Sequence, residues 1–482
     1  MHPENCHTCG LPGRQNLKHD NNQVLGILRA EQPLLEYNHD WVHQNVATLD
    51  GHLLSLRQSL SRLESLTSLI QTQIEAASTA KQQFESIPAP IRRLPRDILL
   101  EIFSLSFRQE DARDYPWTLG HICHWWRDIV HSSPTVWSVV VLCPPYNPKI
   151  VETQLQRSGN VPLSVYISTQ HYGNVHSLTI LDRVMSLSHR WSTLELHAHG
   201  PMYERKLPSF FPQLRTLKVE GPWSRSMVPV FDAPLLQTVR SGDFPLQSVP
   251  NHITHLALSK LSIEELPMLL SFPNLVELHF KAKYFTRDVA PTSTIKHPTI
   301  RCLSVSGISI LPFLTLPALE YFQCGLDRTE DSSPVFAFLS RSRCTLKTLL
   351  TDTMRYSDSF LDLLASQPSL CRLSVSLLGD RHHVICQELA SPELLPNLEH
   401  LTLAWISEEF CVVAKMIRAR WYTPMRRIRA FVVIRNVLEP KNVNIDGMQA
   451  MKDEGLDYKV VQGPCGKEFW LDPLMMETED VW

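Results

Sequence analysis

The chain has 482 residues, of which 43% are hydrophobic and 20% charged, proportions that are ordinary for a globular protein. This length is too great for one small domain and permits a large core or several units. The net charge of -3 argues against a protein dominated by nucleic-acid binding, which normally has a basic surface.

Three further features indicate the environment of the protein. No stretch approaches the roughly 20 consecutive apolar residues of a membrane span. The N-terminus lacks the basic-then-apolar pattern of a signal peptide. The 11 cysteines are odd in number and scattered through apolar segments, which favours free thiols in a reducing compartment. We therefore expect a cytoplasmic protein, a nuclear one, or both, with neither a membrane nor nucleic acid as a partner.

Residues 1–22 are polar and rich in His, Asn and Gly, which predicts a disordered tail. Within this tail, Cys6 and Cys9 have the spacing of a zinc-binding pair, and two thiolates with two imidazoles would satisfy tetrahedral zinc. No second pair with zinc-finger spacing follows, so a tail that happens to hold two cysteines is the favoured interpretation. We expect neither a metal nor a cofactor.

Residues 34–80 carry mostly apolar side chains at heptad spacing, which predicts a coiled-coil helix within residues 23–86. The first series is Leu35, Val42, Leu49, Leu56, Leu63, Ile70 and Ala77, and the second is His39, Val46, Leu53, Leu60, Thr67 and Ile74. His39 and Thr67 interrupt the second series, and Gly51 weakens the helix by up to ~1 kcal/mol. Few charged residues flank the two series. A homodimer through residues 35–77 and a long amphipathic helix that packs on its own protein therefore both stay open.

Residues 87–142 contain two short apolar helices by pattern. The first, Asp97–Phe107, follows the Leu94-Pro95 step, and the second lies around Leu119–Val130. About 25 helical residues cannot bury such broad apolar stripes between themselves, so these helices need a partner surface. The segment contains no phosphate loop or acid–base pair, and we expect it to be a docking module.

This segment resembles an F-box, the adaptor-binding module of SCF-type ubiquitin ligases, and is most similar to the F-box-like proteins of mushroom-forming fungi. The resemblance lies in LPRDILLEIF at 94–103, PW at 116–117, ICHWWRDI at 122–129 and SPTVW at 133–137. Asp97 and His124 depart from the family pattern, which usually has Glu and often has Arg at these positions. Neither departure removes an apolar anchor.

The resemblance implies a small all-helical module that docks to the SCF adaptor and, through it, to a cullin. It also implies a protein that is not itself an enzyme. The residues expected to contact the adaptor are Leu94, Pro95, Ile98, Leu99, Ile102 and Phe103. The residues expected to pack inside the module are Cys123, Trp126, Ile129, Pro134 and Trp137.

Residues 143–437 contain a repeated pattern, apolar-x-x-apolar-x-apolar, that a proline usually precedes. The copies begin at Trp191, Leu214, Leu236, Ile253, Leu275, Ile300, Leu319, Leu346, Leu370, Leu398 and Ile428. They lie roughly 17 to 30 residues apart, around the period of leucine-rich repeats. Each copy predicts one short strand of a parallel sheet, and a return segment such as Ile263–Ser271 predicts helix or irregular coil. A generic β-rich domain is the less favoured alternative.

The repeats depart from the leucine-rich pattern in two ways. The expected Asn or Cys at the end of each copy is found only at Asn436, and the spacing drifts. We therefore expect an irregular, leucine-rich-repeat-like α/β solenoid. Residues 438–482, with a helix-like Asp446–Glu454 and a strand-like Tyr458–Val461, are expected to form its C-terminal cap and tail.

The 21 histidines show no spacing typical of catalysis or metal binding. The repeats contain His252, His255, His279, His297 and the His382-His383 pair near Cys386. No carboxylate, nucleophile or further ligand accompanies them at a suitable spacing, so ordinary surface or strand-end histidines are expected. No nucleotide-binding, zinc-protease or serine-hydrolase motif occurs.

A basic cluster lies near the last repeat. Its members are Lys415, Arg418, Arg420, Arg426, Arg427 and Arg429, with Trp421 beside them. Such a cluster could bind an acidic or phosphorylated segment, but a solvated face is the favoured interpretation.

The expected fold is thus multidomain and α/β, with a coiled-coil helix, an all-helical F-box and an irregular solenoid in chain order. The expected function is substrate recognition in an SCF-type E3 ubiquitin ligase, in which the solenoid binds a protein target and tethering raises its effective concentration. The alternative is a non-ligase interaction scaffold that uses the coiled coil and the solenoid.

Overall fold

The computed structural model describes a large part of the chain. The described residues are 21–29, 36–106, 114–143, 147–168, 176–197, 208–220, 232–242, 246–259, 261, 263–281, 294–325, 333–355, 358–378, 382–405, 410–424, 427–435 and 448–462. Cys6 and Cys9, with most of the predicted tail, lie outside these residues. The chain divides into two compact units, Met1–Ile102 and Phe103–Trp482, which we describe separately.

The first unit is helical in its described part. It contains α1 (Asn21–Leu28), α2 (Glu36–Ser86), the 3-10 helix η1 (Pro90–Arg93) and most of α3 (Arg96–Leu105). The 51-residue α2 runs through the predicted heptad segment without a break at Gly51. It ends shortly before Pro88, as expected because the residue before a proline avoids the helical conformation.

The second unit begins with the end of α3 and short helices that the sequence pattern only partly predicts. These are α4 (Tyr115–Ile122), α5 (His124–His131) and the 3-10 helix η3 (Pro134–Trp137). The prediction of one helix around Leu119–Val130 is wrong, because the chain is extended at Cys123 (φ −158°, ψ 169°). The Cys123 Sγ accepts a hydrogen bond from the Trp126 backbone N–H at 3.5 Å and so caps the start of α5.

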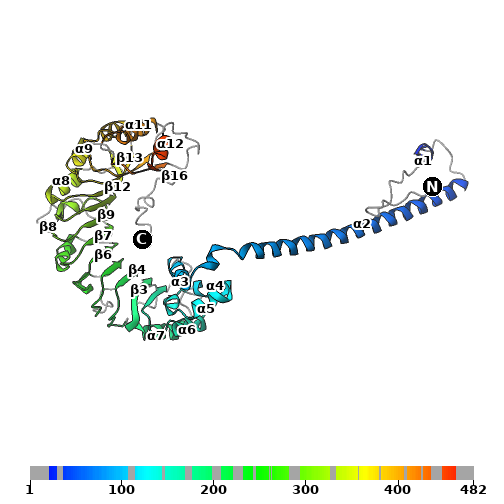
Figure 1. Cartoon of the computed structure of the whole chain (residues 1–482), viewed down its shortest axis with the longest axis horizontal. Helices are drawn as coiled ribbons and strands as arrows, with labels where there is room; N and C mark the ends of the chain where they lie inside the picture. Colours follow the sequence, from blue (N-terminus) through cyan, green and yellow to red (C-terminus); the bar gives the residue numbers. More distant parts are fainter. Residues whose placement is uncertain are drawn as a thin grey trace. The chain divides into compact units, whose positions relative to one another are not determined.

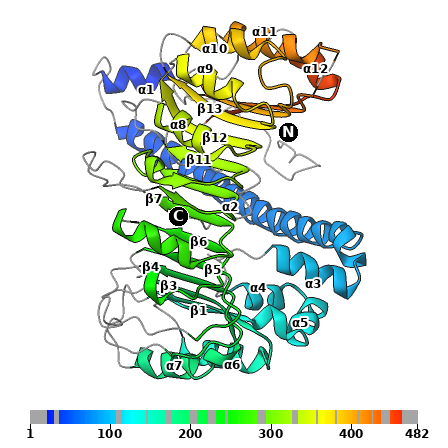
Figure 2. The same cartoon turned by 90° about the vertical axis from the view of Figure 1, so that its left-hand side faces the viewer.

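A parallel sheet follows, with 14 strands in the part of the chain that the structure describes. Its strands lie side by side in chain order, and two short strands lie outside it (Figure 2). The sheet strands are β1 (Val139–Leu142), β2 (Leu163–Ser168), β3 (Trp191–His197), β4 (Thr216–Glu220), β5 (Thr238–Ser241), β6 (His255–Leu258), β7 (Glu277–Lys281), β9 (Cys302–Ser306), β11 (Tyr321–Gly325), β12 (Thr348–Arg355), β13 (Arg372–Leu378), β14 (His400–Trp405), β15 (Ala430–Arg435) and β16 (Asp457–Gln462). β8 (Ile295–Lys296) and β10 (Leu314–Thr315) form a separate parallel pair.

Each predicted copy of the repeat carries one strand of this sheet, so the parallel sheet is confirmed. The strands β1, β2 and β16 extend the sheet beyond the predicted copies. β1 belongs to the segment that the sequence resemblance assigns to the all-helical module, yet it pairs with β2 as the first strand of the sheet. The described chain is therefore a mixed α/β protein with a long open sheet.

The return segments are mostly helical. They are α6 (Pro148–Arg157), α7 (His176–Met185), η4 (Ser188–Arg190), η6 (Leu246–Ser248), η7 (Ile263–Ser271), η8 (Leu311–Phe313), α8 (Ser333–Ser342), α9 (Asp358–Ala365), α10 (His382–Leu389), α11 (Phe410–Trp421) and α12 (Met448–Asp453). In Figure 1 the sheet is curved, with its strands on the inner side of the second unit. The helices α7, α8, α9 and α11 lie on the outer side. Pro267 lies inside η7, which is a 3-10 helix rather than an α-helix.

The core of the second unit lies between the sheet and these return segments. The parallel register aligns one apolar residue from each repeat into a continuous ladder. Its members are Leu194, Leu217, Val239, Leu256, Leu278, Leu303, Phe322, Leu349, Leu373, Leu401 and Phe431. All of them are buried, so each repeat covers the apolar edge of its neighbour, as in stacked repeat proteins.

None of the helices in the described part of the chain combines the length and apolar character needed to cross a lipid bilayer.

Candidate protein-binding surfaces

The Leu94-Pro95 step forms the entry to α3. Leu94 is extended (φ −72°, ψ 136°) and ends η1, because a residue before proline is held away from the helical conformation. The Pro95 carbonyl accepts the first helical hydrogen bond from the Leu99 N–H at 3.1 Å. The proline therefore leads directly into the helix without costing it a backbone hydrogen bond.

The six predicted adaptor contacts differ in exposure. Pro95 and Ile98 are exposed, the latter by 49%, whereas Leu94 and Ile102 are half-buried. Leu99 and Phe103 are buried within the chain itself. Of the six predicted adaptor contacts, Pro95 and Ile98 are therefore the most accessible to another protein.

The five predicted packing residues also differ. Ile129 and Trp137 are buried, Cys123 and Trp126 are half-buried, and Pro134 is exposed at the start of η3. The Trp137 indole N–H donates to the Val130 carbonyl at 2.8 Å, which ties η3 to the end of α5.

A tryptophan pair joins these short helices to the beginning of the sheet unit. Trp117 on α4 meets Trp137 edge to face, with ring centroids 5.0 Å apart. The guanidinium carbon of Arg157, the last residue of α6, lies 4.5 Å from the Trp137 ring centroid and 4.9 Å from that of Trp117. A cation over two ring faces stabilises the contact between α4, η3 and α6. Sequence reasoning noted Trp117 but missed Arg157, which no local pattern marks.

The sheet presents a second candidate surface, the face opposite the buried ladder, which we call the open face. Register aligns its residues into two rows. The first row is Thr193, Thr216, Thr238, His255, Glu277, Cys302, Tyr321, Thr348, Arg372, His400, Ala430 and Asp457. The second is Glu195, Lys218, Arg240, Ala257, His279, Ser304, Gln323, Leu350, Ser374, Thr402, Val432 and Lys459. From β3 to β11 most of these side chains are polar or charged.

A charged network lies on β3 and β4. His197 contacts Glu195 at 2.8 Å and Glu220 at 2.9 Å, and Lys218 reaches the other Glu195 oxygen at 3.2 Å. The hydrogen bond to Glu195 and the charges of both carboxylates raise the pKa of His197 against the opposing effect of burial. The network therefore favours the charged imidazolium on the open face.

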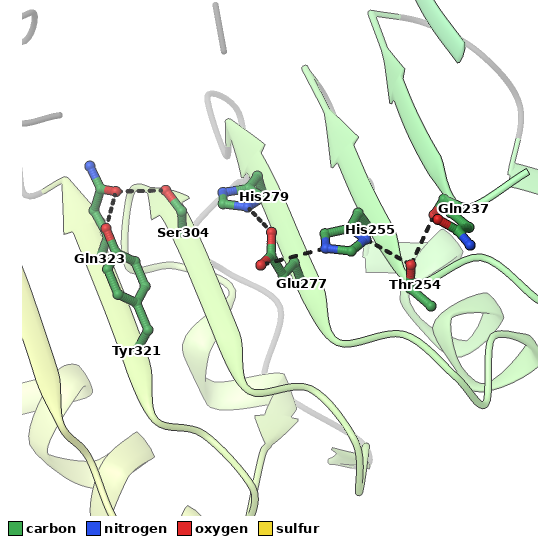
Figure 3. A network of polar contacts seen from close by, with 8 residues as sticks. All are labelled: Gln237, Thr254, His255, Glu277, His279, Ser304, Tyr321 and Gln323. Carbon is green, nitrogen blue, oxygen red and sulfur yellow. Dashed lines mark hydrogen bonds and ion pairs between the residues drawn. The ribbon is translucent and has the colours of Figure 1, made fainter. Parts of the chain in front are cut away.

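A second network lies on β6 and β7 (Figure 3). Glu277 stands between two imidazoles, 3.6 Å from the His255 Nε2 and 3.6 Å from the His279 Nε2. Hydrogen bonding to these two histidines lowers the pKa of Glu277 well below its usual range. The Thr254 hydroxyl lies 2.7 Å from the His255 Nδ1 and donates to the Gln237 carbonyl at 3.3 Å.

This arrangement corrects the expectation that no carboxylate accompanies the repeat histidines. His255 meets Glu277 because the register sets these residues opposite each other on neighbouring strands. The sequence contained this signal, because His255 and Glu277 occupy the equivalent position of two successive repeat copies. Along β7 alone, Glu277 is found two residues before His279. Its contact with His255 appears only when β6 and β7 are aligned.

Polar contacts continue onto β9 and β11, where the Gln323 side-chain oxygen accepts from two hydroxyls. The Ser304 hydroxyl donates at 3.3 Å and the Tyr321 hydroxyl at 3.2 Å (Figure 3). Tyr321 thereby presents an oriented aromatic side chain on β11, two strands along the sheet from Glu277 on β7. Tyrosine is a residue type that protein-binding surfaces use heavily.

The predicted basic cluster does not form a single solvated face. Arg420 is buried and donates to the carbonyls of Ser391 at 2.8 Å and Leu395 at 3.2 Å, and also to those of Leu389 and Leu394. Burial lowers the pKa of Arg420 to about 10. Trp421 is also buried, and its indole N–H donates to Glu454 at 2.8 Å.

The remaining members of the cluster are distributed differently. Arg429 lies 3.6 Å from Glu399, and Arg427 donates to Asn397. Lys415 and Arg418 are exposed, and Arg426 lies outside the described residues. Arg420 and Trp421 therefore serve the packing of α11 rather than a binding surface.

No group of three or more His, Cys, Asp or Glu side chains has a metal-binding arrangement in the described ranges. No protein-family model matches the sequence, and no curated protein matches it either. The two candidate surfaces therefore rest on the residues and geometry given above.

Proposed function

We propose that this protein is the substrate-recognition subunit of an SCF-type ubiquitin ligase. In this proposal, residues 87–142 are an F-box that docks to the SCF adaptor and through it to a cullin. The sheet is an irregular leucine-rich-repeat solenoid whose open face binds a protein target. The chain performs no bond chemistry and acts by holding the target near the ligase.

The observation that carries the proposal is the Leu94-Pro95 step with the exposed Ile98 on the following helix. It agrees with the sequence resemblance over 94–137, in which this step and helix face the adaptor. An apolar side chain that is half exposed next to a rigid proline is a suitable anchor for a partner pocket.

The open face supports the second half of the proposal. Its rows place charged pairs, hydroxyls and Tyr321 on one continuous parallel sheet. Five row members are buried, namely Glu195, Ala257, Cys302, Leu350 and Ser374. The half-buried members between them are therefore the ones that can contact a target. Networks such as His255 with Glu277 hold their side chains in place, which lowers the entropy lost on binding.

Adaptor capture with the purified full chain tests the proposal. Wild-type protein should retain the SCF adaptor, and Leu94→Ala combined with Pro95→Ala should weaken binding about tenfold or more, the effect of losing one well-buried apolar anchor. Ile98→Asp should act similarly, because the side chain is exposed and its replacement leaves the fold intact. Glu101→Gln, an exposed change on the same helix, is the matched control. The proposal fails if wild type does not bind the adaptor, or if all variants bind equally.

A second candidate is a non-ligase interaction scaffold, and the exposed apolar stripe of α2 favours it. Such a scaffold would assemble through its helix and bind targets through the sheet without an adaptor. Co-purification separates the two functions, because only the ligase subunit should carry the adaptor and cullin with it.

A further inference from the structure

Within the first unit, an apolar stripe of α2 is exposed. Its large side chains at heptad positions are Val42, Val46, Leu53, Leu56, Leu60, Leu63, Ile70 and Ile74, with exposed fractions from 38% to 62%. Soluble monomers rarely expose a continuous apolar strip of such length, and a helix gains most of its stability in proteins from packing its apolar face. The stripe therefore requires a covering surface.

Nothing polar interrupts the stripe in a way that would prevent its burial. Thr67, the polar residue in its middle, donates its hydroxyl hydrogen bond to the Leu63 carbonyl at 2.9 Å. Because that donor is already satisfied within the helix, burying Thr67 leaves no unpaired hydroxyl. Other hydroxyls along the helix make the same bond to the carbonyl four residues earlier, at Thr48, Ser59, Ser65, Thr72 and Thr79.

The residues that flank the stripe are compatible with a second copy of the same helix as its partner. In a parallel two-stranded coiled coil, flanking residues of one helix face residues five positions further along the other. For two copies of α2 these pairs are Asn45 with Asp50, His52 with Arg57, Ser59 with Glu64, Leu66 with Gln71, Gln73 with Ser78 and Ala80 with Glu85. None of these pairs opposes two carboxylates, and none opposes two permanently charged cations. Self-pairing in register therefore meets no like-charge repulsion, and the sequence has no charge pattern that selects a different helix.

The side-chain shapes indicate two parallel strands. Leucine is the commonest residue of the first heptad series, which also contains Val42 and Ile70. The second series has three β-branched residues, Val46, Thr67 and Ile74, beside Leu53 and Leu60. β-branched residues at one core position and leucine at the other favour parallel dimers. We propose that α2 pairs with α2 of a second copy of this chain, parallel and in register.

This assembly has a functional consequence that does not depend on the ligase proposal. A parallel pair brings two copies of the sheet unit into one molecule. A target with two binding segments, or a dimeric target, could then bind both open faces. Its second binding event would be intramolecular. Such bivalent binding strengthens capture without any new contact type.

The mass of the purified full chain in solution tests the pairing. Wild type should show twice the 55.2 kDa chain mass, by light scattering or sedimentation at micromolar concentration. Leu56→Glu combined with Leu63→Glu puts charge into the stripe and should give the mass of one chain. The matched control, Ser55→Glu with Arg62→Glu, places the same residue on the outer side of the same two turns and should remain a dimer. A one-chain mass for wild type, a larger oligomer, or a dimer that survives Leu56→Glu with Leu63→Glu would overturn the proposal.

Cross-linking tests the orientation. Ile74→Cys lies away from the middle of the stripe, so it can meet its own counterpart only in a parallel, in-register pair. Mild oxidation should give a disulfide-linked dimer on a non-reducing gel for Ile74→Cys, well above the level seen with Ser68→Cys on the outer side. Equal cross-linking of the two variants would contradict the parallel register. The native cysteines are present in both variants, so their contribution is the same. Adaptor binding by Leu56→Glu with Leu63→Glu separates this proposal from the ligase proposal. A variant with the mass of one chain that still binds the adaptor shows that the two functions are independent.

Discussion

The stripe of α2 and the ladder of the sheet are both regular apolar patterns, yet they lie in opposite surroundings. Leu60 on the stripe is 57% exposed, whereas Leu303 in the ladder is fully buried. Both residues are leucines, but Leu60 belongs to a series with the heptad spacing of a helix, and Leu303 to a series with one residue per repeat. The difference arises because each strand of the sheet is followed by another repeat that covers it.

This comparison shows what an apolar period can and cannot indicate. It identifies the face of an element that must be covered, but it does not say which chain supplies the cover. In the sheet the next repeat does so, as in other stacked repeats. On α2 the exposed leucines indicate a partner of the kind proposed above.

The largest effect is expected for Leu303→Ala in the ladder. The change leaves a cavity between β9 and the return segments and should destabilise the sheet unit by roughly 2–5 kcal/mol. Denaturant unfolding followed by circular dichroism measures the loss. Ser304→Ala, one residue away on the open face, should change stability far less. Equal effects of the two variants would contradict the assignment of the buried and open faces.

A somewhat smaller loss, about 2–4 kcal/mol, is expected for Arg420→Met. The methionine fills much of the space but leaves the carbonyls that Arg420 bonds without a donor in a buried site. Thermal unfolding of the purified protein checks this value. Lys415→Met, an exposed change on the same helix, should leave the melting temperature nearly unchanged. Equal melting temperatures of the two variants would show that the hydrogen bonds of Arg420 do not stabilise the segment between α10 and α11.

Leu60→Ala makes the comparison between the two regions direct. As an exposed residue of the chain, Leu60 should contribute within about 0.5 kcal/mol to the stability of the isolated chain. In the paired helix the same substitution removes a buried side chain from each copy and should weaken self-association about tenfold or more. Sedimentation across a dilution series measures the second effect. Unchanged association would show that the stripe is not the contact.

The smallest effect concerns pH and the network around His197. Its pKa is raised in the folded chain, so the stabilisation it provides is fully present below the ordinary histidine value and is lost as the pH rises through the folded pKa. His197→Gln should therefore cost up to about 1 kcal/mol at pH 5.5 and less at pH 8.5. Unfolding midpoints at the two pH values provide the measurement, with the exposed His189→Gln as control. A loss of stability in His197→Gln that grows with pH would contradict the raised pKa of His197.

Much of the local structure followed from patterns along the chain. Every predicted repeat copy carries a strand, and a single helix runs through the predicted heptads. These elements could be predicted because their apolar spacing repeats many times, so errors at one position do not hide the pattern. The break at Cys123 was missed, since one extended residue between two apolar helices leaves the spacing almost unchanged.

The sequence by itself therefore determined which elements form and which of their faces are apolar, because secondary structure responds to local spacing and to prolines. Only the tertiary structure decided which side chains meet. Strand register brings His255 to Glu277, and packing places Arg157 over two tryptophan rings. Packing also lets Arg420 donate hydrogen bonds to carbonyls of a preceding segment. These contacts join residues that are distant in sequence or lie on different elements, and they depend on how the strands align. No pattern within one element encodes that alignment.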